Sequence, residues 1–163
     1  MIWQTILKAN SLIILDVFPK HVESGYYGDL TRTVVKGQAS EAQRKLWYTV
    51  LEAQKFSLQK IRAGGSGADL QQEVSELFKE KGYPAEIRDG RWVGFFHGLG
   101  HGLGLEIHEQ PRIAKTDFKP GQVLTVEPGL YVPGIGGARI EDDGVVTESA
   151  FEVLSRFPKQ LQV

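Results

Sequence analysis

The segment Phe96-His97-Gly98-Leu99-Gly100-His101-Gly102-Leu103-Gly104-Leu105-Glu106-Ile107-His108-Glu109 holds three of the four histidines of the chain. Every second residue between His97 and His101 is glycine. Imidazole is the commonest metal-ligating side chain in proteins, and it titrates close to neutral pH. Glycine lets the backbone approach a ligand closely. The segment therefore predicts a ligand-binding site, and histidines that merely fill a glycine-rich loop are the alternative.

Short apolar runs on both sides of this segment predict β-strands. These strands are expected at residues 11–17, 26–35, 92–96, 122–126, 138–147 and 151–154. The turn signal Glu23-Ser24-Gly25 joins the first two strands into a hairpin, and the glycine-rich residues 133–137 join the fourth strand to the fifth. Residues 83–91 are expected to be a polar connection without regular structure.

Two amphipathic helices are expected between the hairpins, at residues 40–63 and 68–81. Apolar residues recur every three or four positions in both segments, which is the period of a helix with one buried face. Ser40 and Gln43 have the spacing of a capping box at the first helix start. Both helices are therefore expected to pack one face on the core.

Each hairpin carries an acidic residue on both of its arms. Asp16 and Asp29 flank a turn centred near residues 22 and 23, and Glu127 and Glu141 flank a turn centred on Gly134. If each hairpin is roughly symmetric, each pair lies side by side, where like charges are destabilising. Buried acids need either raised pKa values or cations as compensation. The alternative is that these acids lie exposed at strand ends, as most Asp and Glu residues do.

A divalent-metal site accounts for the acids and the histidines together. Four carboxylates carry a charge of −4, which two divalent cations would neutralise. An oxygen-rich site with one imidazole suits Mn²⁺, Co²⁺, Fe²⁺ or Zn²⁺. The sequence therefore predicts two divalent metal ions between the hairpins.

Composition limits the classes of function that need to be considered. The chain has 163 residues, which suits one domain, and no cysteine, which excludes disulfides and thiolate metal sites. A net charge of −1 indicates neither a nucleic-acid partner nor an anionic membrane. Polar residues at Gln4, Lys8 and Asn10 interrupt the N-terminal apolar run, so neither a signal peptide nor a membrane span is expected. A cytoplasmic location is the expectation.

Competing motifs fail on their spacing. The glycines after Phe96 do not match G-x-G-x-x-G, and the chain contains neither a P-loop nor an H-E-x-x-H motif. Gly65-Ser66-Gly67 lies between two expected helices, whereas a nucleophile elbow follows a strand. A two-metal phosphoesterase is a further alternative, although only Arg32 and Arg139 lie near the acids.

Five motifs, in this order, resemble those of the pita-bread metallopeptidases. That family includes methionine aminopeptidases, Xaa-Pro aminopeptidases and Xaa-Pro dipeptidases, and the motifs here are most similar to the Xaa-Pro branch. The motifs are Asp16, Asp29-Leu30-Thr31-Arg32-Thr33, His97-Gly98-Leu99-Gly100-His101-Gly102-Leu103-Gly104, Thr125-Val126-Glu127-Pro128-Gly129 and Arg139-Ile140-Glu141-Asp142.

The resemblance implies a role for each residue of the expected site. Asp29 and Glu141 would bridge two metal ions, with Asp16 on one of them and His101 and Glu127 on the other. Glu127 would also carry a proton to the leaving nitrogen. His97 and His108 are also expected to be catalytic. They would bind the substrate carbonyls and stabilise the oxyanion, and packing beside the metal ligands is their alternative role.

The resemblance also implies the architecture and the reaction. The expected fold is an α+β pita-bread fold with a curved antiparallel sheet and helices on its outer face, here one catalytic-type domain over residues 1–163 that lacks much of its first half. Exposed sheet edges would then favour a homo-oligomer. The expected reaction is dinuclear metal-dependent hydrolysis of Xaa-Pro bonds in short peptides. A metal-binding but non-catalytic module and a methionine aminopeptidase-like enzyme are alternatives, and a dipeptidase and an aminopeptidase are not distinguished.

Phe18 and Arg139 lie close to the expected metal ligands. Many family members have glycine two residues after the first metal aspartate, where this chain has Phe18. This departure affects the expected conformation of the following loop more than the expected ligands. Arg139, two residues before Glu141, is expected either to orient that carboxylate or to lie on the surface.

Overall fold

The computed structural model describes residues 6–163, so the first five residues of the N-terminal run lie outside it. Within that range, two α-helices combine with short antiparallel strands, and the expected α+β class is confirmed. The helices are α1 (Glu41–Lys60) and α2 (Gly67–Glu80). The strands are β1 (Leu12–Val17), β2 (Leu30–Val35), β3 (Glu86–Arg88), β4 (Arg91–Val93), β5 (His101–Gly102), β6 (Glu109–Arg112), β7 (Val123–Val126), β8 (Gly129–Val132), β9 (Gly136–Arg139), β10 (Asp142–Val146) and β11 (Phe151–Val153).

The first hairpin forms as predicted. β1 and β2 are antiparallel, with Asp16 opposite Thr31. Asp29 precedes Thr31 by two residues, so the two acids are diagonal neighbours on one face. The second strand is shorter than predicted, because residues 26–29 stay outside the ladder and the backbone N–H of Tyr27 donates to the carbonyl of Gly104.

The second hairpin keeps one register along its whole length. Val126 lies opposite Asp142 in the β7–β10 pair, and Gly129 lies opposite Arg139 in the β8–β9 pair. The same register places Glu127 opposite Glu141. The expected strand over residues 138–147 is nevertheless broken there, because the N–H of Glu141 donates to Thr31 and that of Glu127 donates to Leu99.

The histidine segment lies in a five-stranded sheet with the order β11-β10-β7-β5-β6. The β5–β6 register shifts between His101 and Gly102, which is a bulge at the predicted metal histidine. Gly100 has to be glycine because the backbone of Thr125 lies so close that a Cβ at this position would collide with its carbonyl.

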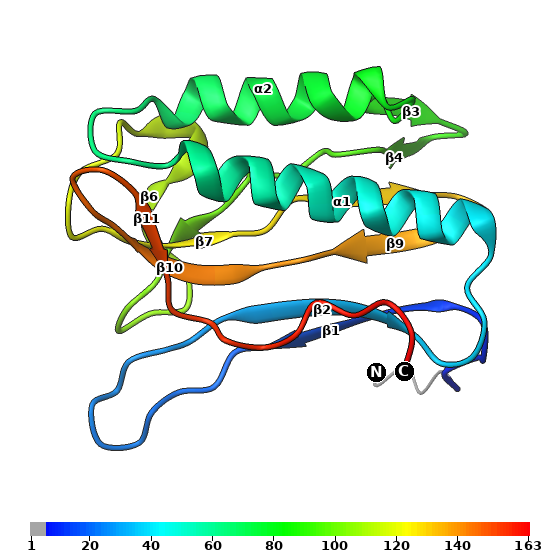
Figure 1. Cartoon of the computed structure of the whole chain (residues 1–163), viewed down its shortest axis with the longest axis horizontal. Coiled ribbons are helices and arrows are strands. Elements are labelled where there is room, and N and C mark those ends of the chain that lie inside the picture. Colours follow the sequence, from blue (N-terminus) through cyan, green and yellow to red (C-terminus); the bar gives the residue numbers. More distant parts are fainter. Residues whose placement is uncertain (1–5) are drawn as a thin grey trace.

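Both helices pack on one side of the strands, above β7 and β9 in Figure 1. The capping box of Ser40 and Gln43 is present at the start of α1. Leu46 and Val50 from α1 and Val74 and Phe78 from α2 are buried in the core. Neither helix of the described residues is long and apolar enough to cross a membrane.

The prediction of a polar connection over residues 83–91 was wrong. β3 and β4 form a hairpin there, and β4 ends at Val93, short of the predicted strand end at residue 96. Asp89 and Gly90 form the turn with positive φ angles of 52° and 73°, as a tight hairpin turn requires. The Asp-Gly pair was a usable signal in the sequence.

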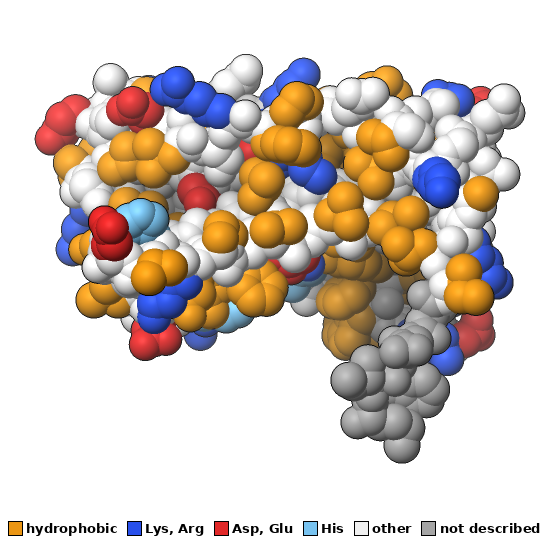
Figure 2. All heavy atoms as spheres, turned by 90° about the horizontal axis from the view of Figure 1, so that it is seen from below, with side chains coloured by type: hydrophobic (Ala, Val, Ile, Leu, Met, Phe, Trp, Pro, Cys, Tyr) orange, Lys and Arg blue, Asp and Glu red, His pale blue; other side chains and the backbone are white. Residues whose placement is uncertain are grey.

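The hairpin of β1 and β2 forms one outer face of the molecule (Figure 1). Hydrophobic side chains are spread over this face (Figure 2). Leu15, Val17 and Phe18 are 47%, 54% and 56% exposed, although an apolar strand is normally covered. Within the described residues, β2 is the only strand partner of β1.

Candidate metal centre

Asp29, His101 and Glu141 meet between the two hairpins. One ligand atom from each lies within 4.8 Å of the others, and all three residues are buried. Asp29 immediately precedes β2, His101 begins β5, and Glu141 lies at the break between β9 and β10. The folding of three separate segments therefore brings together residues as far apart in the sequence as Asp29 and Glu141.

The ring of His101 presents one nitrogen to the acids. Its Nδ1 lies 3.0 Å from the carbonyl of Gly102, which can only accept, so Nδ1 carries the proton of the neutral ring. Its Nε2 lies 3.4 Å from Oε1 of Glu127 and 3.8 Å from Oδ2 of Asp29. Burial lowers the pKa of His101. A neutral imidazole with a free nitrogen toward carboxylates is the form that ligates a metal ion.

The acids of this cluster bind protons more tightly than ordinary acids. Burial, and after it the neighbouring carboxylates of Glu127 and Asp29, raise the pKa of Glu141 to about 9. Burial also raises the pKa of Glu127 to about 7. For Asp29, burial first and then the charge of Asp16 raise the pKa to about 6. Without a cation, protonation therefore removes the charge of the buried acids. Raised pKa values are one of the two forms of compensation that the sequence predicted, and cations are the other.

This donor set fits divalent cations. Carboxylate oxygens with one imidazole nitrogen suit Mn²⁺, Co²⁺, Zn²⁺ or Fe²⁺. A cation would favour the ionised acids that burial otherwise disfavours. Asp29, His101 and Glu141 are therefore a fitting site for a divalent metal ion.

Asp16 lies at the edge of the cluster, where the guanidinium of Arg139 pairs with its carboxylate. Nε of Arg139 also lies 3.2 Å from the hydroxyl of Thr31 and 3.9 Å from Oε2 of Glu127. The Thr31 hydroxyl in turn donates to Oε2 of Glu141 over 2.5 Å. The expectation that Arg139 lies on the surface was wrong. Its contact with Glu141 is indirect, because the Thr31 hydroxyl lies between the guanidinium and the carboxylate. Metal ligation by Asp16 stays a prediction.

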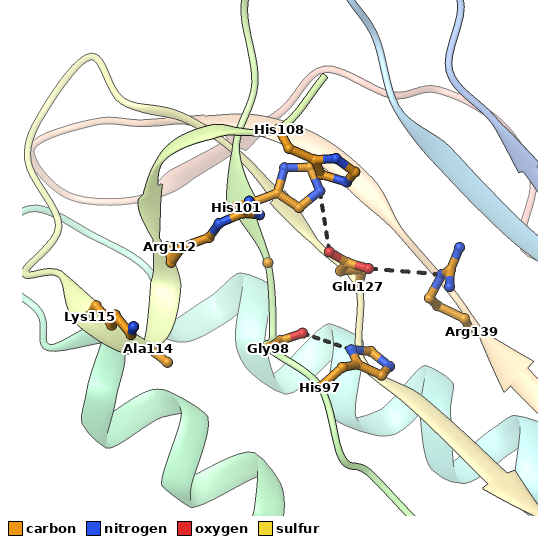
Figure 3. A pocket seen from close by; sticks show the side chains of 10 residues that line it. His97, Gly98, His101, His108, Arg112, Ala114, Lys115, Glu127 and Arg139 are labelled. Carbon is orange, nitrogen blue, oxygen red and sulfur yellow. Dashed lines mark hydrogen bonds and ion pairs between the residues drawn. The ribbon is translucent and has the colours of Figure 1, made fainter. Parts of the chain in front are cut away.

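The other two histidines of the segment line the same cavity as His101 (Figure 3). His97 is held between two neighbours, since its Nδ1 lies 2.8 Å from the carbonyl of Gly98 and its Nε2 lies 3.1 Å from the Tyr131 hydroxyl. His108 is exposed, and its ring centroid lies 4.4 Å from that of His101. Their roles toward substrate stay predictions.

The cavity has a volume of about 560 Å³. Glu127, His101 and Arg139 line the part next to the acids, and Arg112 and Lys115 line another part of the wall (Figure 3). The cavity therefore has one carboxylate, that of Glu127, beside the candidate metal centre, and the cationic groups of Arg112 and Lys115 on another part of its wall.

Sequence reasoning missed Tyr131 and the cationic wall. Tyr131 lies two residues beyond the motif that ends at Gly129, and the sequence gives no sign of its contact with His97. Arg112 precedes the 3₁₀ helix Ile113–Lys115 and Lys115 ends it, and the packing of this helix against α2 has no local sequence signal.

Comparison with known proteins identifies relatives over nearly the whole chain. The model of metallopeptidase family M24 matches residues 3–148. A curated Xaa-Pro dipeptidase from Pyrococcus furiosus is 39% identical over 158 residues, which are 95% of this chain and 42% of that protein. Among solved structures, a dipeptidase from Pyrococcus horikoshii has a TM-score of 0.86 and 35% identity over 98% of this chain and 43% of its own. An X-Pro aminopeptidase from Thermotoga maritima has a TM-score of 0.84 and 35% identity, over 96% of this chain and 42% of its own.

The chain spans 42% to 43% of the length of these relatives. The five quoted motifs, from Asp16 to Asp142, all lie within the residues that the family model matches. The structural similarity over 96% and 98% of this chain confirms the pita-bread fold that the motifs implied. The chain therefore belongs to metallopeptidase family M24.

Proposed function

We propose that this chain carries out metal-dependent hydrolysis of Xaa-Pro bonds in short peptides. The observation that carries the proposal is the meeting of Asp29, His101 and Glu141 beside a cavity large enough for a short peptide. The Xaa-Pro dipeptidase from Pyrococcus furiosus is a relative at 39% identity. Peptide hydrolysis needs a polarised carbonyl, an activated water and a proton for the leaving nitrogen, and this site has candidates for each.

Two divalent ions would be held by five residues. Asp29 and Glu141 would be shared between the ions, Asp16 would complete one set, and His101 and Glu127 would complete the other. When bound, such ions supply Lewis acidity, which polarises the scissile carbonyl and acidifies a water molecule. Asp16 would have to exchange its pairing with Arg139 for the ion, because that guanidinium now contacts its carboxylate.

The remaining steps belong to side chains of the cavity. Glu127 would take the proton of the attacking water and deliver it to the leaving nitrogen. His97 and His108 would donate hydrogen bonds to the substrate carbonyls and to the developing oxyanion. For His97 this requires a second ring proton on Nε2, because the carbonyl of Gly98 at 2.8 Å accepts the Nδ1 proton of the neutral ring. It also requires that Nε2 exchange the Tyr131 hydroxyl, now 3.1 Å away, for the substrate.

The cationic wall favours substrates with a free carboxylate close to the scissile bond. Arg112 and Lys115 line the cavity, and neither forms an ion pair with the described residues. A guanidinium binds a carboxylate through two parallel hydrogen bonds. Dipeptides place their carboxylate next to the bond that is cut, so we propose a dipeptidase rather than an aminopeptidase of longer peptides.

Replacing Arg112 by methionine is expected to raise the KM for an Xaa-Pro dipeptide by about tenfold to a hundredfold, since a hydrogen bond to a charged group contributes about 1.5–3 kcal/mol. The KM for the same dipeptide with an amidated C-terminus should change little. Steady-state kinetics on both substrates measures the difference, with Arg62→Met, an exposed arginine outside the cavity, as the control. Equal losses on both substrates would contradict this role.

The function itself is tested by release of free amino acid from Xaa-Pro dipeptides with added Mn²⁺ or Co²⁺. Turnover that depends on the metal is the expected result. Bound metal without turnover on any Xaa-Pro peptide would favour the metal-binding but non-catalytic module. That alternative is considered because the chain matches only 42% of the length of the Pyrococcus furiosus dipeptidase. Turnover confined to peptides that begin with methionine would favour the methionine aminopeptidase-like alternative.

We further propose that the chain self-associates through its β1 face. Leu15 and Val17 are about half exposed there, and exposed apolar strand edges favour association. Sedimentation velocity should show a dimer or larger species that Leu15→Lys shifts toward the monomer. A monomeric parent chain would contradict this proposal. The cytoplasmic location stays a prediction.

A further inference from the structure

Directly behind the candidate metal centre, Arg32 is buried with only 5% of its surface exposed. A guanidinium has five N–H donors, and here each of them has an acceptor. The acceptors are the carbonyls of Pro158, Thr31, Glu141 and Phe157 and the carboxylate of Asp142. No proposed catalytic step uses this arginine, although it lies in one of the five motifs.

The acceptors of Arg32 come from separate parts of the fold. Thr31 lies on β2, Glu141 and Asp142 belong to the second hairpin, and Phe157 and Pro158 belong to the C-terminal segment. The other carboxylate oxygen of Asp142 accepts from Gln54 of α1 at 2.8 Å and lies 2.5 Å from Nζ of Lys159. One buried cluster thus joins both hairpins, α1 and the C-terminal segment.

Glu141 is fixed from several directions by two consecutive residues. Nη1 of Arg32 donates to its carbonyl over 2.5 Å, and the Thr31 hydroxyl donates to its carboxylate over 2.5 Å. The backbone N–H of Glu141 donates to the Thr31 carbonyl over 3.1 Å. Asp29, on the same segment, precedes Thr31 by two residues. The distance between the two acids therefore depends on how firmly this segment holds Glu141.

We propose that Arg32 is a positioning residue, which fixes Glu141 relative to Asp29 and connects the C-terminal residues Phe157–Lys159 to the metal centre. The inference rests on the proposed metal site. Lysine cannot replace Arg32, because its three donors would leave at least two of the five acceptors unpaired. Stability alone does not account for the cluster, since burying an ion pair costs desolvation that its attraction often fails to offset.

The test compares Co²⁺ binding by the unmodified chain and by Arg32→Lys, followed through the visible absorption of bound Co²⁺. We expect about tenfold weaker binding, the loss that is typical when a group supporting the ligands is changed. The absorption band should also change in position or intensity, because the ligands move. Lys81→Met, which breaks an exposed pair with Glu52, is the control and should leave both readouts unchanged.

A second variant decides the question if Arg32→Lys does not fold. Lys159→Met keeps all five hydrogen bonds of Arg32 but releases the C-terminal segment from Asp142, and we expect Co²⁺ binding to weaken about threefold, less than the usual loss. Unchanged affinity and spectrum in the folded variants would overturn the proposal and leave Arg32 a structural role. Tight Co²⁺ binding by the unmodified chain without peptide hydrolysis would contradict only the proposed function.

Discussion

Replacing Glu141 by glutamine is expected to abolish divalent-metal binding while the metal-free fold stays intact. The side chain is almost fully buried, and its raised pKa of about 9 means that the metal-free chain holds it protonated at neutral pH. Glutamine resembles that protonated acid, and its oxygen can accept the hydrogen bond from Thr31. It lacks the negative charge that a shared metal ligand supplies.

Thermal unfolding with and without Mn²⁺ measures this effect. At a metal concentration of about 100 Kd, the unmodified chain should gain about 2.7 kcal/mol of stability, and the variant should gain almost none. Hydrolysis should fall about a thousandfold or more, since the bound ions contribute several kcal/mol to catalysis. Glu152→Gln on β11, which is exposed, is the matched control. A variant that keeps the metal-dependent gain would contradict the assignment of Glu141.

The metal-free chain is expected to lose stability as the pH rises from about 4 to about 9. Burial is the first cause of the raised pKa values of Asp29 and Asp143, both about 6, of Glu127, about 7, and of Glu141, about 9. Between the unfolded and the folded pKa of each group, the folded chain binds more protons than the unfolded chain. The free energy of unfolding therefore falls as the pH rises through that window.

Urea unfolding in the presence of a chelator, repeated across this pH range, measures how steeply the free energy of unfolding changes with pH. With saturating Mn²⁺ the slope should become flatter or reverse, because the cation stabilises the ionised acids. Glu141→Gln should remove the part of the slope above about pH 7, where Glu141 is the acid still titrating. A metal-free chain that gains stability over this window would contradict the burial of the acids.

The pairing of the acids could be predicted from the sequence because hairpin register is a local property. The turn around Gly134 and the strand lengths fix Glu127 opposite Glu141, and the structure has that register. For Asp16 and Asp29 the same reasoning gave the correct face, although the pair is diagonal. The bulge beside His101 has a signal in the sequence, because the seven-residue step from His101 to His108 would place the two side chains on opposite faces of a regular strand and the glycines allow the chain to bend.

The missed features depend on contacts between distant segments. The second hairpin breaks at its acids because Leu99 and Thr31 take their backbone hydrogen bonds, and neither residue is near them in sequence. The pairing of Arg139 with Asp16 joins residues 123 positions apart. The five acceptors of Arg32 include residues 109 to 126 positions away, so the motif that contains it gave no indication of its role.

The most direct test of the account is an anomalous difference map from crystals of this chain grown or soaked with Mn²⁺. Two peaks are expected between the hairpins, each within bonding distance of the carboxylates of Asp29 and Glu141. Asp16 should lie beside one peak, and His101 and Glu127 beside the other. Peaks elsewhere on the chain, or none at a saturating Mn²⁺ concentration, would contradict it.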